Sequence, residues 1–480
     1  MDFDFLKLFI PESPGAEIIW VGEESSKAFS TKGQVVDCAV ATSLGFDLLG
    51  FCRVVKETGI FVVFWENPLS YLAIKKNPFT IFRKKNSLSH ELKRHGFHCQ
   101  IKFSCDGECQ RIFLLDHLPT QKLQVSGNLK DIKNSLFSSR FFQPFMPYQG
   151  IVASRNGDFD IPLVSITQLV EQKGFDGSFE GCFISKTGIA VIEFPELIVR
   201  MGLNTTGNKR VVNNAENINK VLMGGHSVLR QKIPITIASG KLGLCSFCAE
   251  SKIRGENAEV VAKNPTLVQT MTSDAAQFLL DFSKKSVELV SMDNGIMSLY
   301  VEAPFNRIIE FSKCSVNVAF LLQVKNYVVK LLRGQMIPLV CQHGDYKLAN
   351  MKFDAVSGKL TGVFDWDMAE LRGLPVLDLY HLLLSDEIVG PSAVNRVDVL
   401  AEKLFPFQFK AWHRDLLWGY FESMHIAKAL ERAFALLYWV GQLVKRIRHG
   451  EISNDVERSI DQKILKLTPV IINEFGNKIH

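Results

Sequence analysis

A short stretch of the chain carries carboxylate and amide side chains at spacings that suit chemistry on a phosphate group. Asp345 follows a strand-like apolar run and a glycine, and Asn350 comes five positions later. A turn signal at residues 356–359 leads into a second strand-like run, which ends on Asp365 and Asp367. The two runs predict a β-hairpin. We expect this hairpin to bring the side chains of Asn350 and Asp365 toward one point.

These residue types match what phosphoryl transfer requires. The reaction depends mostly on positioning the reactants and on neutralising charge. One carboxylate must orient the acceptor hydroxyl and receive its proton, and Asp345 fits this role. Mg²⁺ takes hard oxygen ligands and keeps several waters, so two protein ligands, Asn350 and Asp365, are sufficient. Asp367 is either a ligand of a second Mg²⁺ or a partner of the loop backbone.

Three segments of this region resemble motifs of the aminoglycoside phosphotransferase/choline kinase family. His343–Asn350 is similar to the family's HGDxxxxN loop, and Phe364–Asp367 is similar to its (I/F)DW(E/D) segment. Gly373–Leu379 resembles the G-x-P-x-x-DL helix start that follows. The order and spacing agree, and the resemblance covers residues 190–440. It implies a protein-kinase-like fold, with ATP and Mg²⁺ as cofactors and with the site roles given above.

Several neighbours of these motifs have structural interpretations. We expect His343 to brace the turn and Asp378 to cap the helix that follows it, since an N-cap Asp accepts from free backbone N–H groups. Lys347 is expected to face outward, with contact to the γ-phosphate as the alternative. Apolar residues at helical spacing over residues 380–384 and 416–448 predict helices that pack in a core.

The family resemblance also implies a nucleotide site upstream. A predicted hairpin carries Arg200 where a kinase needs a cation for the α- and β-phosphates. Glu216 opens a predicted helix and is either the carboxylate that pairs with Arg200 or an exposed helical side chain. Backbone groups of the segment that contains Glu250, Ser251 and Ile253 are expected to bind the adenine.

The first part of the chain, residues 1–148, shows an alternation of strand-like and helix-like segments, which indicates an α/β domain. An amphipathic stretch at residues 46–56 predicts a helix that ends at Thr58–Gly59. Strand-like runs lie at residues 17–22, 34–40 and 60–65.

Residues 35–103 resemble part of a class I methyltransferase. Arg53–Ile60 is similar to the segment that reads RVLKPGG in that fold, and Ser87–Phe97 is similar to its late helix and turn. The glycine-rich turn that binds the methyl donor is missing before residue 35. We therefore expect a partial Rossmann-like domain, used for packing or for contact with a protein partner.

The predicted fold class is α+β, with a bilobal protein-kinase-like fold preceded by this α/β domain. Residues 149–180 are expected to form a connection with one short helix at residues 164–173. Residues 181–258 are then the kinase-like N-lobe and residues 259–480 the helical C-lobe.

The bulk composition excludes several classes of protein. The chain has 480 residues, of which 47% are hydrophobic, and its net charge is +5 without a long basic stripe, so a nucleic-acid partner is not expected. No apolar run approaches the length of about 18 residues that a membrane span needs. The acidic start Met1–Phe5 lacks the basic segment of a signal peptide. We expect a cytoplasmic protein with reduced thiols.

Two cysteine groups have spacings that raise the question of a metal site. Cys245 and Cys248 form a CxxC pair in a strand-like run, without a second pair. The second, looser group is His95, His98, Cys99, Cys105 and Cys109. For both groups, the preferred interpretation is that the side chains are small buried hydrophobes and not metal ligands.

The predicted function is ATP- and Mg²⁺-dependent phosphoryl transfer to a hydroxyl of a small molecule such as a sugar or an amino alcohol. The alternative is a catalytically weak nucleotide-binding or scaffolding protein. Arg200 in place of Lys and the covering loop at residues 180–188, which has no GxGxxG pattern, favour this alternative. An active methyltransferase is a third possibility, opposed by the missing donor-binding turn.

Overall fold

The chain divides into two compact units in the computed structural model. The first unit comprises residues 1–212 and 236–252, and the second comprises residues 213–235 and 253–480. The boundary falls within helix α6 (Thr205–Met223). The structure describes residues 161–479 except 186, 224–229, 386–398 and 450–453, and before them residues 7–8, 18–21, 36–41, 55–66, 92–94, 96–97, 99–105, 111–114 and 148–154.

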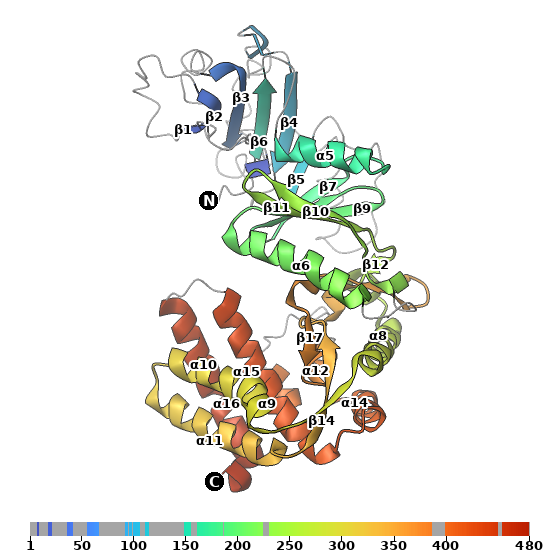
Figure 1. Ribbon diagram of the computed structural model, residues 1–480, viewed down its shortest axis with the longest axis vertical. Helices are drawn as coiled ribbons and strands as arrows, with labels where there is room; N and C mark the ends of the chain where they lie inside the picture. Colours follow the sequence, from blue (N-terminus) through green and yellow to red (C-terminus); the bar gives the residue numbers. More distant parts are fainter. Residues whose placement is uncertain are drawn as a thin grey trace. The chain divides into compact units, whose positions relative to one another are not determined.

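One eleven-stranded sheet forms the first unit, in the order β1-β2-β3-β6-β4-β5-β7-β8-β9-β11-β10. The first three strands run parallel, and the later neighbours pair antiparallel. Figure 1 shows β3, β6 and β4 side by side. The strands are β1 (Ile18–Val21), β2 (Val36–Ala41), β3 (Val55–Glu66), β4 (Cys99–Cys105), β5 (Arg111–Leu114), β6 (Tyr148–Ser154), β7 (Gly181–Ile184), β8 (Ile189–Glu193), β9 (Leu197–Gly202), β10 (Thr236–Leu242) and β11 (Cys245–Ser251).

The strand predictions for the N-terminal part are confirmed, but one helix prediction is wrong at its end. The strands β1, β2 and β3 cover the three predicted runs. The expected helix end at Thr58–Gly59 lies inside β3, which is continuous from Val55 to Glu66. Residues 46–54 lie outside the described part of the chain. The β-branched and aromatic residues that follow Gly59 favour extended pairing with β2 and β6, and this pairing outweighs the glycine.

The eleven-stranded sheet includes part of residues 149–180, the segment that was expected to be a connection. Strand β6 pairs with both β3 and β4, and β5 pairs with β7. The expected short helix is present as α5 (Pro162–Gln172), with its proline in the first turn, where the missing N–H costs nothing. Buried apolar side chains on both sides of residue 160, such as Val62 and Ile192, belong to one core. The described residues of the first unit therefore share one sheet and one core.

The predicted hairpin that carries Arg200 is confirmed. Strands β8 and β9 pair antiparallel, and β9 also pairs with β11. Arg200 lies opposite Cys248 of β11. Cys245 and Cys248 both lie in β11 and are buried, as the strand interpretation predicted. Of the looser cysteine and histidine group, Cys99 and Cys105 lie in β4, and the other three residues lie outside the described part of the chain.

Helices dominate the second unit. Two three-stranded sheets accompany them, in the orders β12-β15-β16 and β13-β14-β17. Their strands are β12 (Glu256–Asn257), β13 (Glu288–Ser291), β14 (Met336–Gln342), β15 (Met351–Phe353), β16 (Leu360–Val363) and β17 (Glu370–Gly373). The longer helices are α8 (Pro265–Ser286), α10 (Ala303–Phe311), α11 (Ser315–Leu332), α12 (Leu377–Ser385), α14 (Ala411–Ser423), α15 (Glu431–His449) and α16 (Asn454–Ile479).

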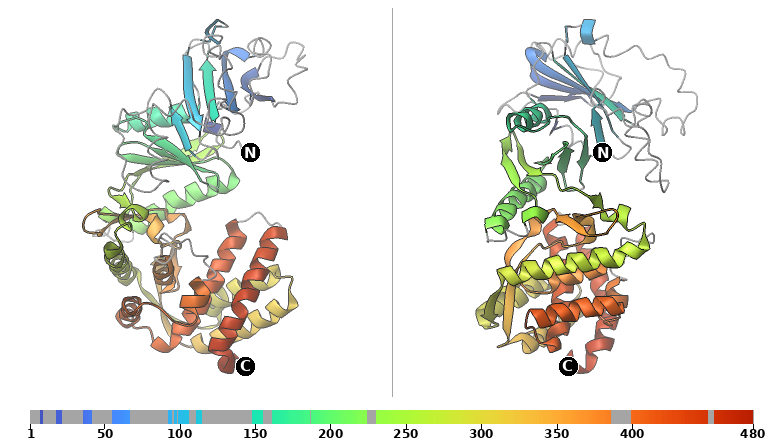
Figure 2. Two further views of the ribbon diagram at one scale, coloured as in Figure 1. Left: turned by 180° about the vertical axis from the view of Figure 1, so that it is seen from behind. Right: turned by 90° about the vertical axis from the view of Figure 1, so that its right-hand side faces the viewer.

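The core of the second unit lies between these helices. Figure 2 shows α10 and α11, in yellow, packed with α15 and α16, in red. The apolar stripe predicted from helical spacing falls on α14 and α15, and its members Phe421, Phe434 and Tyr438 are buried. The separate strands and helices confirm the α+β class. Across the described residues, no helix combines the length and the hydropathy needed to cross a bilayer.

Candidate functional site

The predicted hairpin is present, and a glycine allows the loop before it, which contains Asp345, to pack against the loop after it, which contains Asp365 and Asp367. Strands β15 and β16 pair antiparallel. Gly344 follows β14 with φ +81°, in the left-handed region that favours glycine. A Cβ at this position would lie 2.2 Å from the carbonyl oxygen of Met368 in the 3₁₀ turn η8 (Trp366–Met368). Only glycine therefore lets the Asp345 loop pack directly against the Asp365–Asp367 loop.

Asp345 sits in a network that engages both of its carboxylate oxygens. His381 Nε2 lies 3.0 Å from Oδ1. Lys347 Nζ and Asn350 Nδ2 lie 2.7 and 2.9 Å from Oδ2. Burial by itself raises the pKa of Asp345, but the hydrogen bond from His381 and the charge and hydrogen bond of Lys347 together hold this pKa well below its ordinary value. The carboxylate is therefore ionised and fixed in orientation. The expectation that Lys347 faces outward is wrong, because its ammonium group contacts Asp345.

The backbone of the same loop is held by two charged side chains from distant helices. The Asp378 carboxylate accepts from the amides of His343 and Gly344, at 2.6 and 3.1 Å. The Lys445 ammonium group donates to the Gly344 carbonyl. Burial raises the pKa of Asp378, and the charge of Lys445 and the two backbone hydrogen bonds oppose this effect. Asp378 was expected to cap its own helix, but it lies in the first turn of α12 and accepts from the amides of the Asp345 loop instead.

His343 braces the turn, as expected. Its Nε2 lies 3.0 Å from the carbonyl oxygen of Phe364, and its Nδ1 accepts from the Asp345 amide at 3.3 Å. These two bonds fit a neutral ring protonated on Nε2. The ring is 1% exposed and packs on Trp366, with 4.6 Å between ring centroids. His343 thus joins the two acidic loops without facing solvent.

The residues proposed as metal ligands flank the joined loops. The Phe364 amide donates to the Asn350 carbonyl at 3.0 Å, which places Asn350 beside the residue that precedes Asp365. Asp365 has φ +72° and ψ +57°, a left-handed conformation that is uncommon for a residue with a Cβ. Asp367 is buried in η8. The two loops on which these three residues lie are thus brought together.

The donor set suits a hard cation. Asn350 uses its Nδ2 to bond Asp345, so its Oδ1 is the atom that faces away from this bond. An amide oxygen and the Asp365 carboxylate are ligands that Mg²⁺ accepts, with waters in its other positions. Within the described ranges, no group of three or more His, Cys, Asp and Glu side chains could hold a metal ion. A site that relies on amide and water oxygens is consistent with that finding.

Helix α6 holds the Asp365–Asp367 loop through two asparagines. Asn214 Oδ1 accepts from the Trp366 amide at 2.9 Å, and Asn217 Nδ2 donates to the Trp366 carbonyl at 2.9 Å. Glu216 lies between them in sequence and points elsewhere. Its side chain is 58% exposed and pairs with Lys220 at 3.1 Å. The interpretation of Glu216 as an exposed helical side chain is the one that the structure supports.

Arg200 has a different carboxylate partner, within the first unit. Arg200 Nε donates to Glu250 Oε1 at 2.9 Å, and the two side chains are only 11% and 3% exposed. The Glu250 side chain thus holds the proposed phosphate-binding cation, and the expected contact of the backbone of this segment with adenine stays a prediction. Ser251 lies at the end of β11, opposite Leu197. In the second unit, Ile253 packs against Gly362 of β16.

The turn between β7 and β8 uses its backbone amides internally. The Gly188 amide donates to the Ser185 carbonyl at 3.0 Å, and the Ile189 amide donates to Ser185 Oγ at 3.1 Å. A phosphate-binding loop presents such amides to its ligand. These two amides are therefore not available for phosphate in this conformation.

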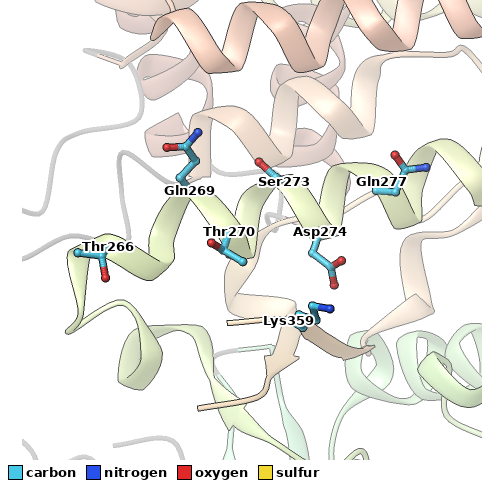
Figure 3. Close-up of a pocket in the computed structure, with 7 residues that line it drawn as sticks. All are labelled: Thr266, Gln269, Thr270, Ser273, Asp274, Gln277 and Lys359. Atoms are coloured by element: carbon cyan, nitrogen blue, oxygen red, sulfur yellow. The ribbon is translucent and has the colours of Figure 1, made fainter. Parts of the chain in front are cut away.

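A polar groove of about 410 Å³ lies along α8, as Figure 3 shows. Asp274 in this groove accepts from the Leu360 amide at 2.8 Å and is 3.7 Å from Lys232 Nζ. None of its lining residues belongs to the acidic loops, so it is separate from the Asp345 network. The lining residues are Thr266, Gln269, Thr270, Ser273, Asp274, Gln277 and Lys359.

Sequence reasoning missed three residues that hold the site, namely His381, Lys445 and Asn214. Lys445 belongs to a short basic cluster, residues 445–448, which by itself is typical of a solvated helix face. His381 stands one helical turn after Asp378, in a helix whose other residues after it are mostly leucine. A histidine directly before a run of leucines in a buried helix needs a hydrogen-bond partner, and this is a signal that could have identified it.

Comparison with known proteins finds one family model that matches part of this region. Residues 310–417 match the sequence model of the "Phosphotransferase enzyme family". No curated protein sequence is significantly similar to the chain.

Similar solved structures include three phosphotransferases. The gentamicin complex of APH(2″)-IIa is 14% identical, with 64% of this chain and 97% of that chain covered and a TM-score of 0.44. The ADP-bound aminoglycoside phosphotransferase APH(2″)-Ib is 15% identical, with coverage of 64% and 98% and a TM-score of 0.43. APH(3″)-Id from Streptomyces rimosus is 13% identical, with coverage of 58% and 98% and a TM-score of 0.37.

At these identities the likeness assigns no role to any residue of this chain. The family match overlaps the three motifs between His343 and Leu379, and it does not depend on the solved structures. Residues 310–417 thus carry the sequence signature of the phosphotransferase enzyme family, in the segment that contains the acidic loops.

Proposed function

We propose that this protein transfers the γ-phosphoryl group of ATP to a hydroxyl of a small molecule, with Mg²⁺ as cofactor. One observation carries the proposal: Asp345, ionised and fixed on both oxygens, lies in a loop joined to the loop of Asp365 and Asp367. Sugars, amino alcohols and related metabolites are the acceptor class that we propose.

Asp345 would act mainly by orienting the acceptor hydroxyl. A carboxylate with a pKa well below its ordinary value is a weak base, so it does not remove the proton early. In a loose phosphoryl-transfer transition state, little charge develops on the attacking oxygen before the phosphoryl group arrives. A well-oriented weak base is sufficient in such a reaction.

Asn350 and Asp365 would hold the metal. Mg²⁺, when bound, neutralises charge on the transferring phosphoryl group. Asn350 Oδ1 and the Asp365 carboxylate are the ligands that we propose, and Asp367 is a reserve ligand or a support for the turn. The Asn350–Asp345 bond links the metal side of the site to the acceptor side.

A catalytically weak nucleotide-binding protein is the second candidate. The buried Arg200–Glu250 pair favours it, because a cation already neutralised by Glu250 has less attraction for phosphates. The internal bonds of the Ser185–Gly188 turn favour it as well. Both candidates bind Mg·ATP, and only the first transfers a phosphoryl group at an appreciable rate.

Thermal shift and ATP hydrolysis together test the proposal. We expect Mg·ATP to raise the melting temperature, and we expect S-adenosylmethionine to leave it unchanged. Asp365→Ala should remove the Mg·ATP shift. Asp345→Asn should retain the shift and lose the slow hydrolysis of ATP. Asp281→Asn, on the exposed side of α8, is the matched control and should behave as wild type.

Each outcome has a distinct meaning. The absence of any Mg·ATP shift in the wild-type protein would refute both candidates. A shift without hydrolysis would leave the second candidate. Normal hydrolysis by Asp345→Asn would contradict the role of Asp345. A metabolite phosphorylation screen with the active wild type then identifies the acceptor, and parallel reactions with GTP decide the nucleotide.

A further inference from the structure

A buried chain of three side chains leads from the helical core to Asp345. The Tyr438 hydroxyl lies 2.8 Å from His381 Nδ1, and His381 Nε2 lies 3.0 Å from Asp345 Oδ1. Tyr438 belongs to α15 and His381 to α12. Each is 2% exposed. The Tyr438–His381 bond is therefore shielded from water, and the His381–Asp345 bond is partly shielded, since the Asp345 side chain is 19% exposed.

The donors and acceptors of this chain have a definite direction. The ionised Asp345 carboxylate can only accept, so His381 Nε2 carries a proton and donates it. With a neutral ring, Nδ1 then accepts from the Tyr438 hydroxyl. His381 contacts the titratable groups of Asp345 and Tyr438, and Lys347 pairs with the same Asp345 carboxylate. Tyr438 thus selects the tautomer and ring orientation that Asp345 requires.

The two oxygens of Asp345 differ in their surroundings. Oδ2 accepts from Lys347 and Asn350, which uses both of its lone-pair positions. Among the described residues, Oδ1 accepts from His381 alone, so one lone-pair position on Oδ1 remains open to a ligand. An acceptor hydroxyl would therefore bond to Oδ1. His381 holds the same oxygen, so it determines where the hydroxyl proton is received.

We propose that His381, oriented by Tyr438, is the positioning residue that fixes Asp345 Oδ1 toward the acceptor hydroxyl. This inference rests on the proposed phosphoryl transfer. His381 and Tyr438 touch neither nucleotide nor acceptor, and they act through Asp345. Small displacements of a reacting group can reduce a rate about 100-fold. The loss of His381 should therefore lower kcat and leave the KM for ATP nearly unchanged.

A set of matched variants tests the positioning role. His381→Leu removes the donor, and His381→Gln retains an N–H donor of similar reach. We expect kcat for ATP hydrolysis by the full chain to fall roughly 10- to 100-fold in His381→Leu, with the KM for ATP changed less than about 3-fold. His381→Gln should recover part of the loss. Tyr438→Phe should lower kcat about 3- to 10-fold, which is the size of effect that the loss of one hydrogen bond produces.

Two further variants control for stability. His413→Leu removes another buried histidine ring, in α14. Tyr420→Phe removes another buried tyrosine hydroxyl, which bonds Ser283 at 2.9 Å. We expect both controls to change the melting temperature as the test variants do and to leave kcat within about twofold of wild type.

A spectroscopic readout tests the geometry independently of turnover. In ¹⁵N-histidine-labelled full-length protein, we expect His381 to be the Nε2–H tautomer in the wild type, with a changed Nδ1 shift in Tyr438→Phe. An Nδ1–H tautomer, or hydrolysis by His381→Leu within twofold of wild type, would overturn the inference and leave the proposed function standing. If the wild type neither binds nor hydrolyses Mg·ATP, the proposed function fails, and the catalytic role of His381 fails with it. The histidine spectrum then still decides whether His381 holds Asp345.

Discussion

The contribution of the buried Arg200–Glu250 ion pair to the stability of the first unit can be tested directly by mutation. Replacing Glu250 by Leu leaves the Arg200 guanidinium without its carboxylate in a position where the side chain is 11% exposed. A buried ion that loses its partner destabilises a protein strongly, because its desolvation is no longer offset. The exposed pair of Glu216 and Lys220 serves as the matched control.

The expected effect is large enough to separate the two pairs. Breaking a buried ion pair costs about 3–5 kcal/mol, which for a unit of this size lowers Tm by roughly 6–20 °C. Breaking the exposed helical pair in Glu216→Leu costs about 0.3–0.5 kcal/mol, a shift of roughly 1–2 °C. Differential scanning calorimetry of the full chain measures both.

A double variant then distinguishes an ion-pair effect from simple loss of packing. Arg200→Met together with Glu250→Leu removes both charges, and buried pairs replaced in this way are often neutral or more stable. We expect the double variant to melt above either single variant. If Glu250→Leu shifts Tm no more than Glu216→Leu, or if the double variant melts below both singles, the buried pair does not have the energetic role described.

Four further predictions concern the second unit. Gly344→Ala should abolish ATP hydrolysis, since a Cβ would lie 2.2 Å from the Met368 carbonyl oxygen; wild-type turnover in this variant would contradict the close packing of the two loops. Lys445→Met should lower kcat about 10-fold, because the Gly344 carbonyl loses a charged donor worth about 1.5–3 kcal/mol, and unchanged kcat would refute it. Asp461→Ala should destabilise α16 by about 2–4 kcal/mol, since its carboxylate accepts from Ser312 and Asn317 at 2.5 and 2.7 Å; hydrogen exchange across α16 measures this, and unaltered protection would argue against it. Asp345, whose pKa is depressed, should stay ionised far below pH 5, so the stability it contributes is present above about pH 4 and is lost only as the pH falls toward its folded-state pKa. A Tm difference between the wild type and Asp345→Asn that already disappears as the pH falls through 6 would contradict this.

The acidic loops were predictable because their determinants are local. Asp345, Asn350 and Asp365 lie within one hairpin, and the turn and the apolar alternation that form it can be identified in the sequence. Gly344, directly before Asp345, is a turn signal that can be recognised without knowledge of its contact with Met368. Short-range features of this kind depend on neighbouring residues, so a single sequence contains most of the information.

The supports of these loops were not predictable, because they come from far along the chain. His381, Lys445 and Asn214 reach the site from three different helices, and sequence spacing does not indicate which helix face meets which loop. The partner of Arg200 depends on strand register. Arg200 lies opposite Cys248, and Glu250 is two residues further along β11 and so on the same face. A register shifted by one residue would have turned Glu250 away.

The end of the predicted helix at Gly59 was wrong for a related reason. Glycine after an amphipathic stretch is a helix-ending signal, and the sequence contains it. Pairing with β2 on one side and β6 on the other favours a continuous strand from Val55. Strand β6 lies about 90 residues later in the chain, so this stabilisation is invisible to a local pattern.

The antiparallel pairing between β5 and β7 has a practical consequence for the choice of fragments of this chain. Arg111 and Ile112 pair with Phe183 and Cys182, so a fragment that begins at residue 181 would present β7 as a bare edge, with unpaired backbone groups. The same cut would uncover apolar side chains such as Ile192 that share a core with the N-terminal strands. Such an edge invites pairing with a second chain. A monomeric fragment therefore needs the N-terminal strands, and the strands from β7 onward are better studied in the full-length protein.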